Sequence, residues 1–289
     1  MLVRSVCHVG ELRVTFHGVR GSTPCHGPTT ARYGGNTSCV SVWADGQRPL
    51  LCDLGTGLRY FGKQWEAHTP DPIDAVALVS HLHWDHVQGL PFFVPMLREG
   101  AHLDVYGPAQ TSGNEGGTFH RALNETVRPP TFPVTLADFA GTFSVHDVAD
   151  TVFSIGDYTI TSRVVPHIGP TVGYRIEYGS KSVAYISDHQ QAHDGSMGVP
   201  DSVRDLADGV DLLIHDAQYT PAEFAQRFNW GHCTQEFAIR VGMVSGARSV
   251  ALYHHDPERT DDELDAFSPC GESESLTVFA AREGQTVIL

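Results

Sequence analysis

Four potential metal ligands lie within six residues in the segment His81-Leu82-His83-Trp84-Asp85-His86. The preceding run, 75–80, is apolar and β-branched, so we expect a strand that ends at the first histidine. Imidazole and carboxylate groups are the ligands that suit zinc, manganese or iron. Crowding four of them into one loop is costly unless a cation or water organises them. The segment therefore predicts a metal site at the end of a strand.

Ten apolar or β-branched runs predict strands, and four stretches predict helices. The strands are expected at 12–17, 38–44, 50–53, 75–80, 103–106, 159–165, 172–177, 182–187, 211–215 and 249–253. Residues 178–181 form a compact turn, so the strands on either side of it are expected to pair as a hairpin. Helices are expected after His86, after Thr220, at 234–244 and at 261–267. This order indicates an α+β fold, with two sandwiched sheets and helices outside.

No Ser/Pro linker divides the 289 residues, which predicts a single domain over 1–289. The least regular part is 108–150, which is rich in Gly, Pro, Thr and Asn. Long stretches of this kind inside a compact domain are often lids or binding loops. We expect either a lid or a surface insertion without a catalytic role.

The formal net charge is −15, from 34 acidic and 19 basic residues. Because an acidic surface repels a phosphate backbone, extended RNA or DNA is not expected as a partner. A local pocket can still hold one phosphate group, so the charge leaves small phosphorylated substrates open.

The cysteine pattern indicates free thiols. No C-x-x-C pair occurs, and a chain of this length does not need disulfides for stability. The six cysteines are Cys7, Cys25, Cys39, Cys52, Cys233 and Cys270. No run approaches 18 apolar residues, and the first residues have no apolar core of signal-peptide length. A cytoplasmic location without membrane contact is expected.

The pattern of His81, His83, Asp85 and His86 resembles the H-x-H-x-D-H signature of the metallo-β-lactamase superfamily. The resemblance implies an αββα four-layer sandwich with a binuclear metal site at one edge. Two divalent ions are expected, zinc first, with Mn²⁺ or Fe²⁺ as alternatives. Asp53, in Leu51-Cys52-Asp53-Leu54-Gly55, resembles the family's early Asp-x-Gly motif, whose aspartate supports the metal loop without binding metal.

The resemblance also implies the remaining ligands. His167 follows Val164-Val165-Pro166, and Asp188 ends the run 183–187; His189 and His193 are weaker candidates. In 251–257, alignment of Leu-x-His selects His254 as the final ligand, with His255 as the alternative. One metal is thus assigned to His81, His83, His167 and Asp188, and the other to Asp85, His86, His254 and the bridging Asp188. The nucleophile implied is a hydroxide that the two ions share.

The segment Trp230-Gly231-His232-Cys233-Thr234 resembles the Gly-His-Ser/Thr element of the phosphodiesterase branch, which includes ribonuclease Z and the cyclic-phosphate diesterases. There the histidine stabilises or protonates the departing oxygen, and an imidazole can do so near neutral pH. His232 is therefore the expected catalytic residue, together with the ligand Asp85. Asp216 is placed to orient His232, or it is simply a polar residue at the edge of the core.

Two glycine-rich segments, 18–24 and 34–38, also resemble the phosphodiesterase branch, and such turns let backbone N–H groups approach an anion. Arg20, Asn36 and Ser38 are candidate substrate contacts, although turn structure explains them nearly as well. His255, if it is not a ligand, is a further candidate for contact with the substrate.

The expected reaction is hydrolysis of a small phosphodiester, such as a cyclic nucleotide. Ribonuclease Z proteins typically carry a tRNA-gripping arm between the positions of His167 and Asp188, and here only 20 residues separate them. This short gap favours a small substrate, so an RNA 3′-processing endonuclease is the alternative and not the first expectation. A lactonase or thioesterase of the same superfamily is a further alternative. The resemblance leaves both a monomer and a homodimer open.

Overall fold

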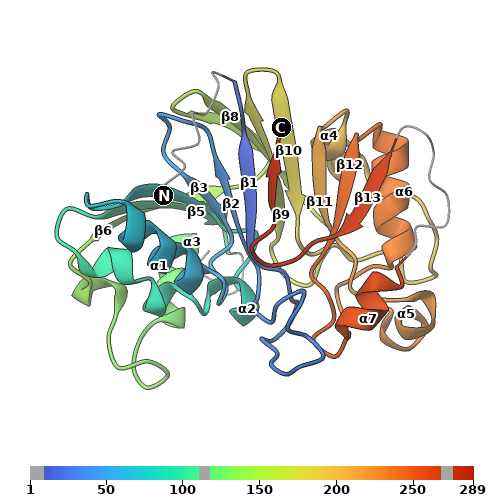
Figure 1. Ribbon diagram of the computed structural model, residues 1–289, viewed down its shortest axis with the longest axis horizontal. Helices are drawn as coiled ribbons and strands as arrows, with labels where there is room; N and C mark the ends of the chain where they lie inside the picture. Colours follow the sequence, from blue (N-terminus) through green and yellow to red (C-terminus); the bar gives the residue numbers. More distant parts are fainter. Residues whose placement is uncertain (1–9, 111–117, 268–275) are drawn as a thin grey trace.

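The structure is a computed structural model that describes residues 10–110, 118–267 and 276–289. Two seven-stranded sheets face each other in the order β14-β1-β2-β3-β4-β5-β6 and β13-β12-β11-β10-β9-β8-β7 (Figure 1). The first comprises β1 (Arg13–Gly18), β2 (Cys39–Trp43), β3 (Leu50–Cys52), β4 (Asp74–Leu78), β5 (His102–Pro108), β6 (Thr142–Val148) and β14 (Thr286–Ile288). The second comprises β7 (Thr151–Ile155), β8 (Tyr158–Val164), β9 (Val172–Tyr178), β10 (Lys181–Ile186), β11 (Leu212–Asp216), β12 (Ser249–Tyr253) and β13 (Thr277–Ala280).

The helices cover the outer faces of the two sheets. They are α1 (Leu58–His68), α2 (Trp84–Val87), α3 (Phe119–Thr126), α4 (Asp201–Ala207), α5 (Pro221–Arg227), α6 (Gln235–Ser245) and α7 (Asp261–Asp265), with short 3₁₀ turns at Leu90–Phe92, Val94–Leu97 and Leu136–Asp138. Helices α1 and α3 contact the first sheet, and α4 and α6 contact the second. The architecture is the expected αββα sandwich.

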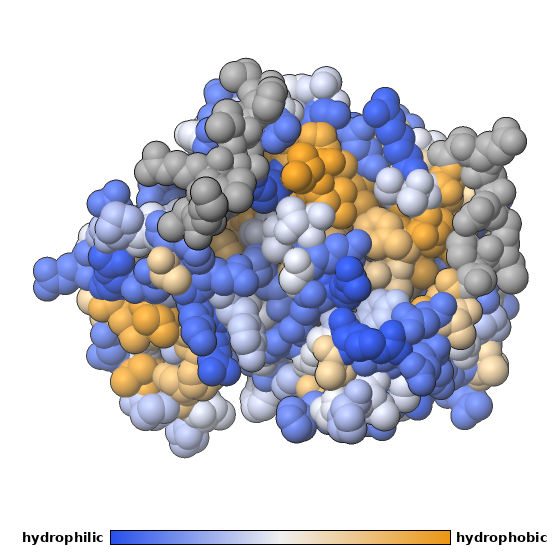
Figure 2. Space-filling view, viewed as in Figure 1, coloured by the Kyte–Doolittle hydropathy of each residue, from blue (hydrophilic) through white to orange (hydrophobic). Residues whose placement is uncertain are grey.

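Alternation along the strands creates these layers. In β4, Val76 and Leu78 belong to the core between the sheets, whereas Ala75 and Ala77 belong to the core under α1. Successive side chains of a strand point to opposite faces, so an apolar strand can pack on both sides. A third cluster packs α4 and α6 against the second sheet. Figure 2 shows one face of the surface, where hydrophilic residues predominate and hydrophobic ones gather at the upper centre and right and, separately, at the lower left.

Parallel pairing places several strand ends at one edge. Strands β3, β4, β5 and β6 run parallel in the first sheet, and β10, β11, β12 and β13 do so in the second. The polar segments after β4, β10, β11 and β12 therefore leave the sheets on the same side. This edge carries the predicted metal loop.

Side-chain caps fix the helices near this edge. Thr234 accepts a hydrogen bond from the backbone N–H of Phe237 at 3.1 Å, and α6 ends at Gly246, whose φ of 66° suits glycine. Thr220 and Glu223 form a reciprocal capping box at the start of α5. The predicted helix at 234–244 is thus confirmed with nearly the same bounds.

Several elements were not predicted. Strands β6, β7, β13 and β14 and helices α1, α3 and α4 are additional to the sequence-based prediction. The prediction of an irregular stretch at 108–150 is wrong for α3 and β6, because β6 pairs with β5 along seven residues. A lid role for this stretch stays a prediction, and residues 111–117 lie outside the described residues.

The predicted hairpin is confirmed, since Lys181 pairs with Tyr178 across a two-residue turn. The four cysteines within the described residues are free: Cys25, Cys39, Cys52 and Cys233; Cys7 and Cys270 lie outside them. None of the helices in the described part of the chain is long and apolar enough to span a membrane.

Candidate metal centre

The loops at the shared edge bring all seven predicted ligands into one cluster. Their donor atoms form four overlapping groups, each within 4.8 Å, which together also include His232. The groups are His81, His83 and His167; His81, His86 and Asp188; Asp85, His86 and His254; and Asp188, His232 and His254. The ligands come from both sheets, so the centre exists only in the folded chain.

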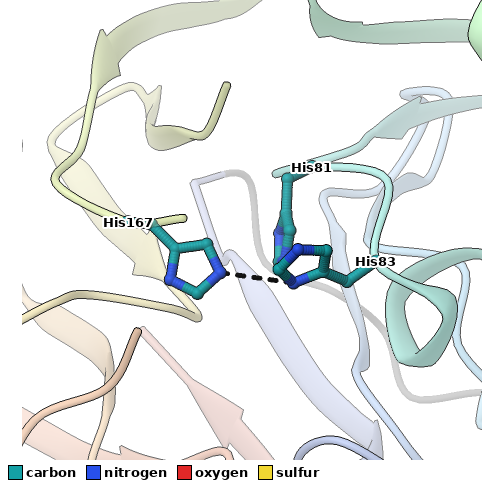
Figure 3. Close-up of side chains that lie close together, drawn as sticks. All are labelled: His81, His83 and His167. Carbon is teal, nitrogen blue, oxygen red and sulfur yellow. Dashed lines mark hydrogen bonds between the residues drawn. The ribbon is translucent and has the colours of Figure 1, made fainter. Parts of the chain in front are cut away.

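His81, His83 and His167 converge at one end of the cluster (Figure 3). The Nδ1 atom of His167 lies 2.7 Å from the carbonyl oxygen of Gly231. Because a carbonyl oxygen can only accept, Nδ1 is the donor of this hydrogen bond. Its Nε2 atom lies 3.3 Å from Nδ1 of His83. Burial lowers the pKa of His167 to about 4, so the ring stays neutral and its Nε2 lone pair is available.

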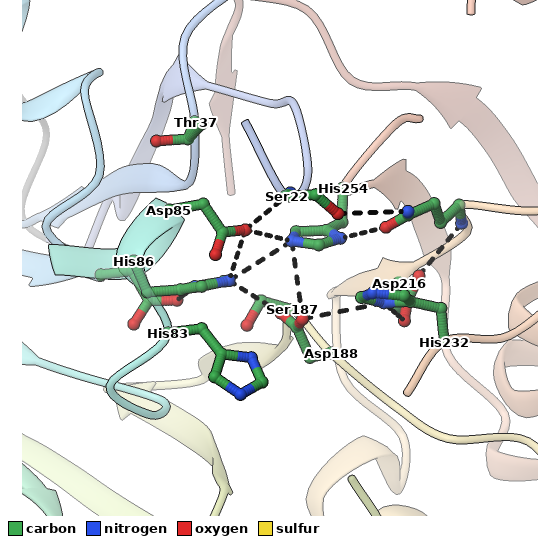
Figure 4. A network of polar contacts seen from close by, with 12 residues as sticks. Ser22, Thr37, His83, Asp85, His86, Ser187, Asp188, Asp216, His232 and His254 are labelled. Atoms are coloured by element: carbon green, nitrogen blue, oxygen red, sulfur yellow. Dashed lines mark hydrogen bonds and ion pairs between the residues drawn. The ribbon is translucent and has the colours of Figure 1, made fainter. Parts of the chain in front are cut away.

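Asp85, His86 and His254 converge at the other end (Figure 4). Nε2 of His254 lies 3.1 Å from Oδ2 of Asp85 and 3.3 Å from Nε2 of His86. On its far side, Nδ1 of His254 donates to the side-chain oxygen of Gln218 at 2.8 Å. The backbone N–H of Ser22 donates to Asp85 at 2.8 Å and fixes that carboxylate. Nε2 of His254 thus faces the centre because Gln218 holds the opposite nitrogen of the ring.

Asp188 lies between the two ends. One of its carboxylate oxygens is 3.2 Å from Nε2 of His86. The other is 3.5 Å from Nε2 of His254 and 3.8 Å from Nε2 of His167. A carboxylate in this position can place one oxygen on each of two cations.

Asp53 lies outside the cluster and holds the ligand His86 by a hydrogen bond, in agreement with its motif. It follows β3 with a φ of 60° and is fully buried. Its carboxylate accepts hydrogen bonds from the backbone and side chain of Ser80, from the Tyr185 hydroxyl and from Nδ1 of His86 at 2.7 Å. Holding Nδ1 of a histidine in this way fixes its tautomer and turns Nε2 toward a metal.

The cluster requires positive charge. Burial alone would lower the pKa of His86, but the carboxylates of Asp85, Asp188 and Asp53 outweigh it and raise that pKa well above its ordinary value. Burial would likewise raise the pKa of Asp188, but His254 and other imidazoles hold it well below the usual range. The pKa of Asp85 is also held well below the usual range by His86 and His254 against the effect of burial, so two buried carboxylates are ionised and positive charge beside them stabilises the site.

The donor set fits metal ions. Two buried atoms that face the cluster lack a hydrogen bond among the described residues: Nε2 of His81, and Oδ2 of Asp188, which has only the ion-pair contact with His86 at 3.2 Å. Leaving such atoms unpaired is costly, so native proteins rarely do so without a ligand. Burial also holds the pKa of His81 well below its ordinary value, which favours a neutral nitrogen donor. The residues would hold divalent ions through imidazole nitrogens and carboxylate oxygens.

His232 lies at the margin of the cluster, above the end of β11. Its Nδ1 atom donates to Oδ2 of Asp216 at 3.0 Å and lies 3.7 Å from Oδ1 of Asp188. Asp216 is fully buried and also accepts from the backbone N–H groups of His189 and Gln218. The predicted pairing of Asp216 with His232 is thus present.

A cleft of about 520 Å³ opens onto the cluster. Its walls include His83, Asp85, Asp188 and His232 together with large apolar side chains. A small molecule that enters this cleft can therefore reach both the candidate metal ligands and His232.

Four predicted substrate contacts need correction. Arg20 is fully buried and donates to the carbonyl oxygens of Gly34, Asp256 and Arg259. Ser38 is fully buried, and the side chain of Asn36 donates to Glu283 at 3.0 Å. Arg20 and Asn36 thus hold the glycine-rich segments against the second half of the chain, because the backbone of such turns needs polar partners.

His255 also faces away from the cleft. Its Nε2 atom donates to the carbonyl oxygen of Ala281 at 2.8 Å, and burial lowers its pKa to about 3. His254, not His255, lies in the cluster. Among the weaker candidates, His189 pairs with His215 at 3.0 Å and the ring of His193 contacts Phe228.

Sequence reasoning missed the residues that orient the ligands. These residues act by hydrogen bonds to His254, Asp85 or Asp53, and they are Gln218, Ser22, Tyr185 and Ser80, the last with two bonds. In the sequence, Gln218 is marked only by its position two residues after Asp216, and Ser22 only by its position in the glycine-rich segment 18–24.

Comparisons with known proteins agree with this geometry. A family model described as "Beta-lactamase superfamily domain" matches residues 48–255. "Ribonuclease Z" of Natronomonas pharaonis is 25% identical and covers 96% of this chain and 97% of its own length. The metallo-beta-lactamase fold protein YhfI from Bacillus subtilis has a similar structure, with a TM-score of 0.71 at 20% identity over 97% of this chain and 100% of that one. Human tRNase Z, short form, has a TM-score of 0.67 at 19% identity over 95% and 98%. The chain therefore belongs to the metallo-β-lactamase superfamily of metal-dependent hydrolases.

Proposed function

We propose that the protein hydrolyses a small phosphodiester, such as a cyclic nucleotide. The observation that carries this proposal is the position of His232. It lines the same cleft as Asp85 and Asp188, and its Nδ1 atom is bonded to Asp216. An imidazole held in this way can donate a proton from Nε2 to an oxygen that leaves phosphorus. A thioester has less need of such a donor, because the thiolate that leaves is a weaker base than an alkoxide.

Two divalent ions fit the cluster. His81, His83, His167 and Asp188 would hold one, and Asp85, His86, His254 and Asp188 would hold the other. When bound, such ions lower the pKa of water and neutralise charge on a phosphate. The donor set suits zinc, and manganese or iron are alternatives.

The side chains around the cluster have two roles, orientation of the ligands and proton transfer. Asp53 and Gln218 orient His86 and His254 through hydrogen bonds of 2.7 and 2.8 Å. Asp216 fixes the ring of His232, and the leaving oxygen takes its proton from Nε2 as the P–O bond breaks. Water molecules outside the cleft can return that proton.

Two observations favour a small substrate over structured RNA. The β9–β10 hairpin, with its two-residue turn, fills the stretch between His167 and Asp188. A net charge of −15 also weakens binding of an extended phosphate backbone. A relative named Ribonuclease Z, similar along nearly its whole length, nevertheless favours RNA processing as a second candidate.

The test is a substrate panel on purified protein loaded with Zn²⁺ or Mn²⁺, with metal analysis of the same sample. The panel contains bis(p-nitrophenyl) phosphate, a purine cyclic nucleotide, a precursor tRNA, a lactone and a thioester. We expect the first two to be cleaved. Cleavage of the precursor tRNA alone would select the second candidate. Robust lactone or thioester hydrolysis with no phosphodiester cleaved would refute both.

A further inference from the structure

Large apolar side chains surround the mouth of the metal cleft. The exposed fractions of Trp84, Ile168 and Trp230 are 67%, 52% and 58%. All three line the cleft of about 520 Å³, and each lies within two residues of a cluster residue in the sequence. We call Trp84 and Trp230 the rim tryptophans.

This exposure sets the two apart from the other tryptophans of the chain. The chain has four tryptophans, and the other two, Trp43 and Trp65, pack against each other with ring centroids 6.1 Å apart. An indole exposed to water forgoes the hydrophobic free energy that burial would give. Two of them at the mouth of one cleft therefore indicate contact with a ligand.

The ring of Trp230 is held in place from one side. The guanidinium of Arg227 lies 5.4 Å from the centroid of Trp230 and 5.6 Å from that of Tyr219. Arg227 is itself anchored by Asp256 at 2.9 Å. A cation stacked on one face of an indole fixes the ring while the other face stays free for a ligand.

Trp84 borders a second pocket in addition to the metal cleft. It also lines an apolar groove of about 260 Å³ with Phe92 and Phe132, whose rings meet edge to face at 5.7 Å. The ring of Trp84 thus lies between this groove and the metal cleft.

The charges of the cleft restrict what the rim tryptophans can bind. Among the described residues that line it, neither lysine nor arginine occurs. Besides the acidic and imidazole groups of the centre, a second phosphate would find only the neutral polar side chains of Ser22 and Asn229 there. The part of the substrate beyond the reacting phosphate must therefore bind through uncharged surfaces, and an indole binds flat heteroaromatic rings best.

We propose that the rim tryptophans form a stacking platform for a nucleobase, and that the substrates are diesters with one phosphate and one base. This inference rests on the proposed phosphodiesterase function and names its substrate class. Stacking is independent of charge, so it gives an acidic protein affinity for an anionic nucleotide although no lysine or arginine is among the described residues that line the cleft.

The test compares two substrates that differ only in the base: a purine cyclic nucleotide and the corresponding base-free ribose cyclic phosphate. The readout is selectivity, the ratio of kcat/KM for the first substrate to that for the second. Trp230→Ala should lower this ratio roughly 5- to 100-fold. Trp230→Phe should keep most of the selectivity, whereas Trp230→Leu should lose it, because leucine is apolar but has no aromatic face.

Met243→Ala provides the matched control, since Met243 is an exposed apolar residue on α6 that does not line the cleft. Equal selectivity in the wild type and Trp230→Ala would overturn the platform. Selectivity retained by Trp230→Leu would also overturn it, because the contact would then be merely apolar. Metal content is measured for every variant.

A binding measurement separates this inference from the proposed function. Calorimetry on the metal-loaded protein compares adenosine 5′-monophosphate with ribose 5-phosphate. The platform predicts tighter binding of the first, and loss of that difference in Trp230→Ala. If the wild type cleaves no diester but shows this pattern, only the reaction is refuted. If it cleaves diesters but binds both probes equally, only the platform is refuted.

Discussion

Asp216 accepts a hydrogen bond from Nδ1 of His232 across 3.0 Å at the end of β11. The bond assigns the Nδ1 proton and leaves Nε2 as the nitrogen that can exchange a proton with a molecule in the cleft. His232 also lies near Asp188, at 3.7 Å. Its position is therefore compatible with a proton donor and with a further metal ligand, and these two roles give different outcomes on mutation.

His232→Ala should lower kcat by roughly 10²- to 10⁴-fold for a cyclic nucleotide, whose leaving alkoxide needs a proton. The loss should be much smaller for bis(p-nitrophenyl) phosphate, because p-nitrophenolate leaves readily without protonation. Metal content should remain that of the wild type. Steady-state kinetics on both substrates, with metal analysis, checks the prediction.

The partner variant Asp216→Asn should show the same dependence on the leaving group with a smaller loss, since an amide orients the ring less strongly than a carboxylate. Equal losses on both substrates, or release of metal from His232→Ala, would assign His232 a structural or ligand role instead.

Asp188→Ala should release both ions. Among the described residues, Asp188 alone can offer an oxygen to each half of the cluster, and its removal leaves several imidazoles without a central anion. Metal analysis after dialysis should find a marked loss of metal, while Asp208→Ala, an exposed carboxylate after α4, should match the wild type. Two tightly held ions in Asp188→Ala would contradict the bridging position.

Patterns of local origin could be predicted from the sequence. Ten strands and the seven ligands were found because apolar runs and strand-end motifs are contiguous. Strand β6, Thr142–Val148, was not predicted, because its alternating polar and apolar residues lie inside a stretch rich in glycine and proline. Helix α1 was missed because Gly62 weakens helix propensity at its centre; an added Cβ there would lie 2.9 Å from Phe93.

Contacts between distant segments could not be predicted. Arg20 was expected in the cleft, but it bonds to carbonyl oxygens some 236 residues away, which no local pattern indicates. The bond from His254 to Gln218 likewise depends on how β11 and β12 lie side by side. The sequence identifies groups with metal-binding chemistry, whereas their orientation is a property of the tertiary structure.

Gly231→Ala should weaken metal binding. Gly231 has a φ of 97°, and an added Cβ would lie 2.5 Å from Cε1 of His167, the ring that its own carbonyl orients. The ring must move, so metal affinity should fall by roughly 10- to 100-fold. Competition with a chromophoric chelator measures this affinity.

Gly179→Ala is the matched control, because Gly179 also has a positive φ, 59°, but open space around it. Both variants should lose about 1 kcal/mol of stability through backbone strain. Only Gly231→Ala should lose metal affinity, and equal affinity in the two variants would mean that His167 is not held by this contact.

His17 offers a test of the fold away from the metal centre. It lies in β1, bonded to Ser41 at 2.8 Å, and burial lowers its pKa to about 4 from an ordinary value of 6.5. The unfolded chain therefore binds a proton on this histidine at a higher pH than the folded protein does. Protonation favours unfolding between these two values.

Above about pH 6.5, His17 should consequently make no pH-dependent contribution to the free energy of unfolding. As the pH decreases from there toward 4, His17 should lower that free energy by an amount on the order of 3 kcal/mol. His17→Gln removes the titrating group and keeps a polar side chain beside Ser41, so its loss of stability over this range should be smaller. His120→Gln, at an exposed position on α3, should retain the wild-type pH dependence. Urea denaturation at several pH values measures all three. Parallel profiles for the wild type and His17→Gln would show that burial does not keep His17 neutral.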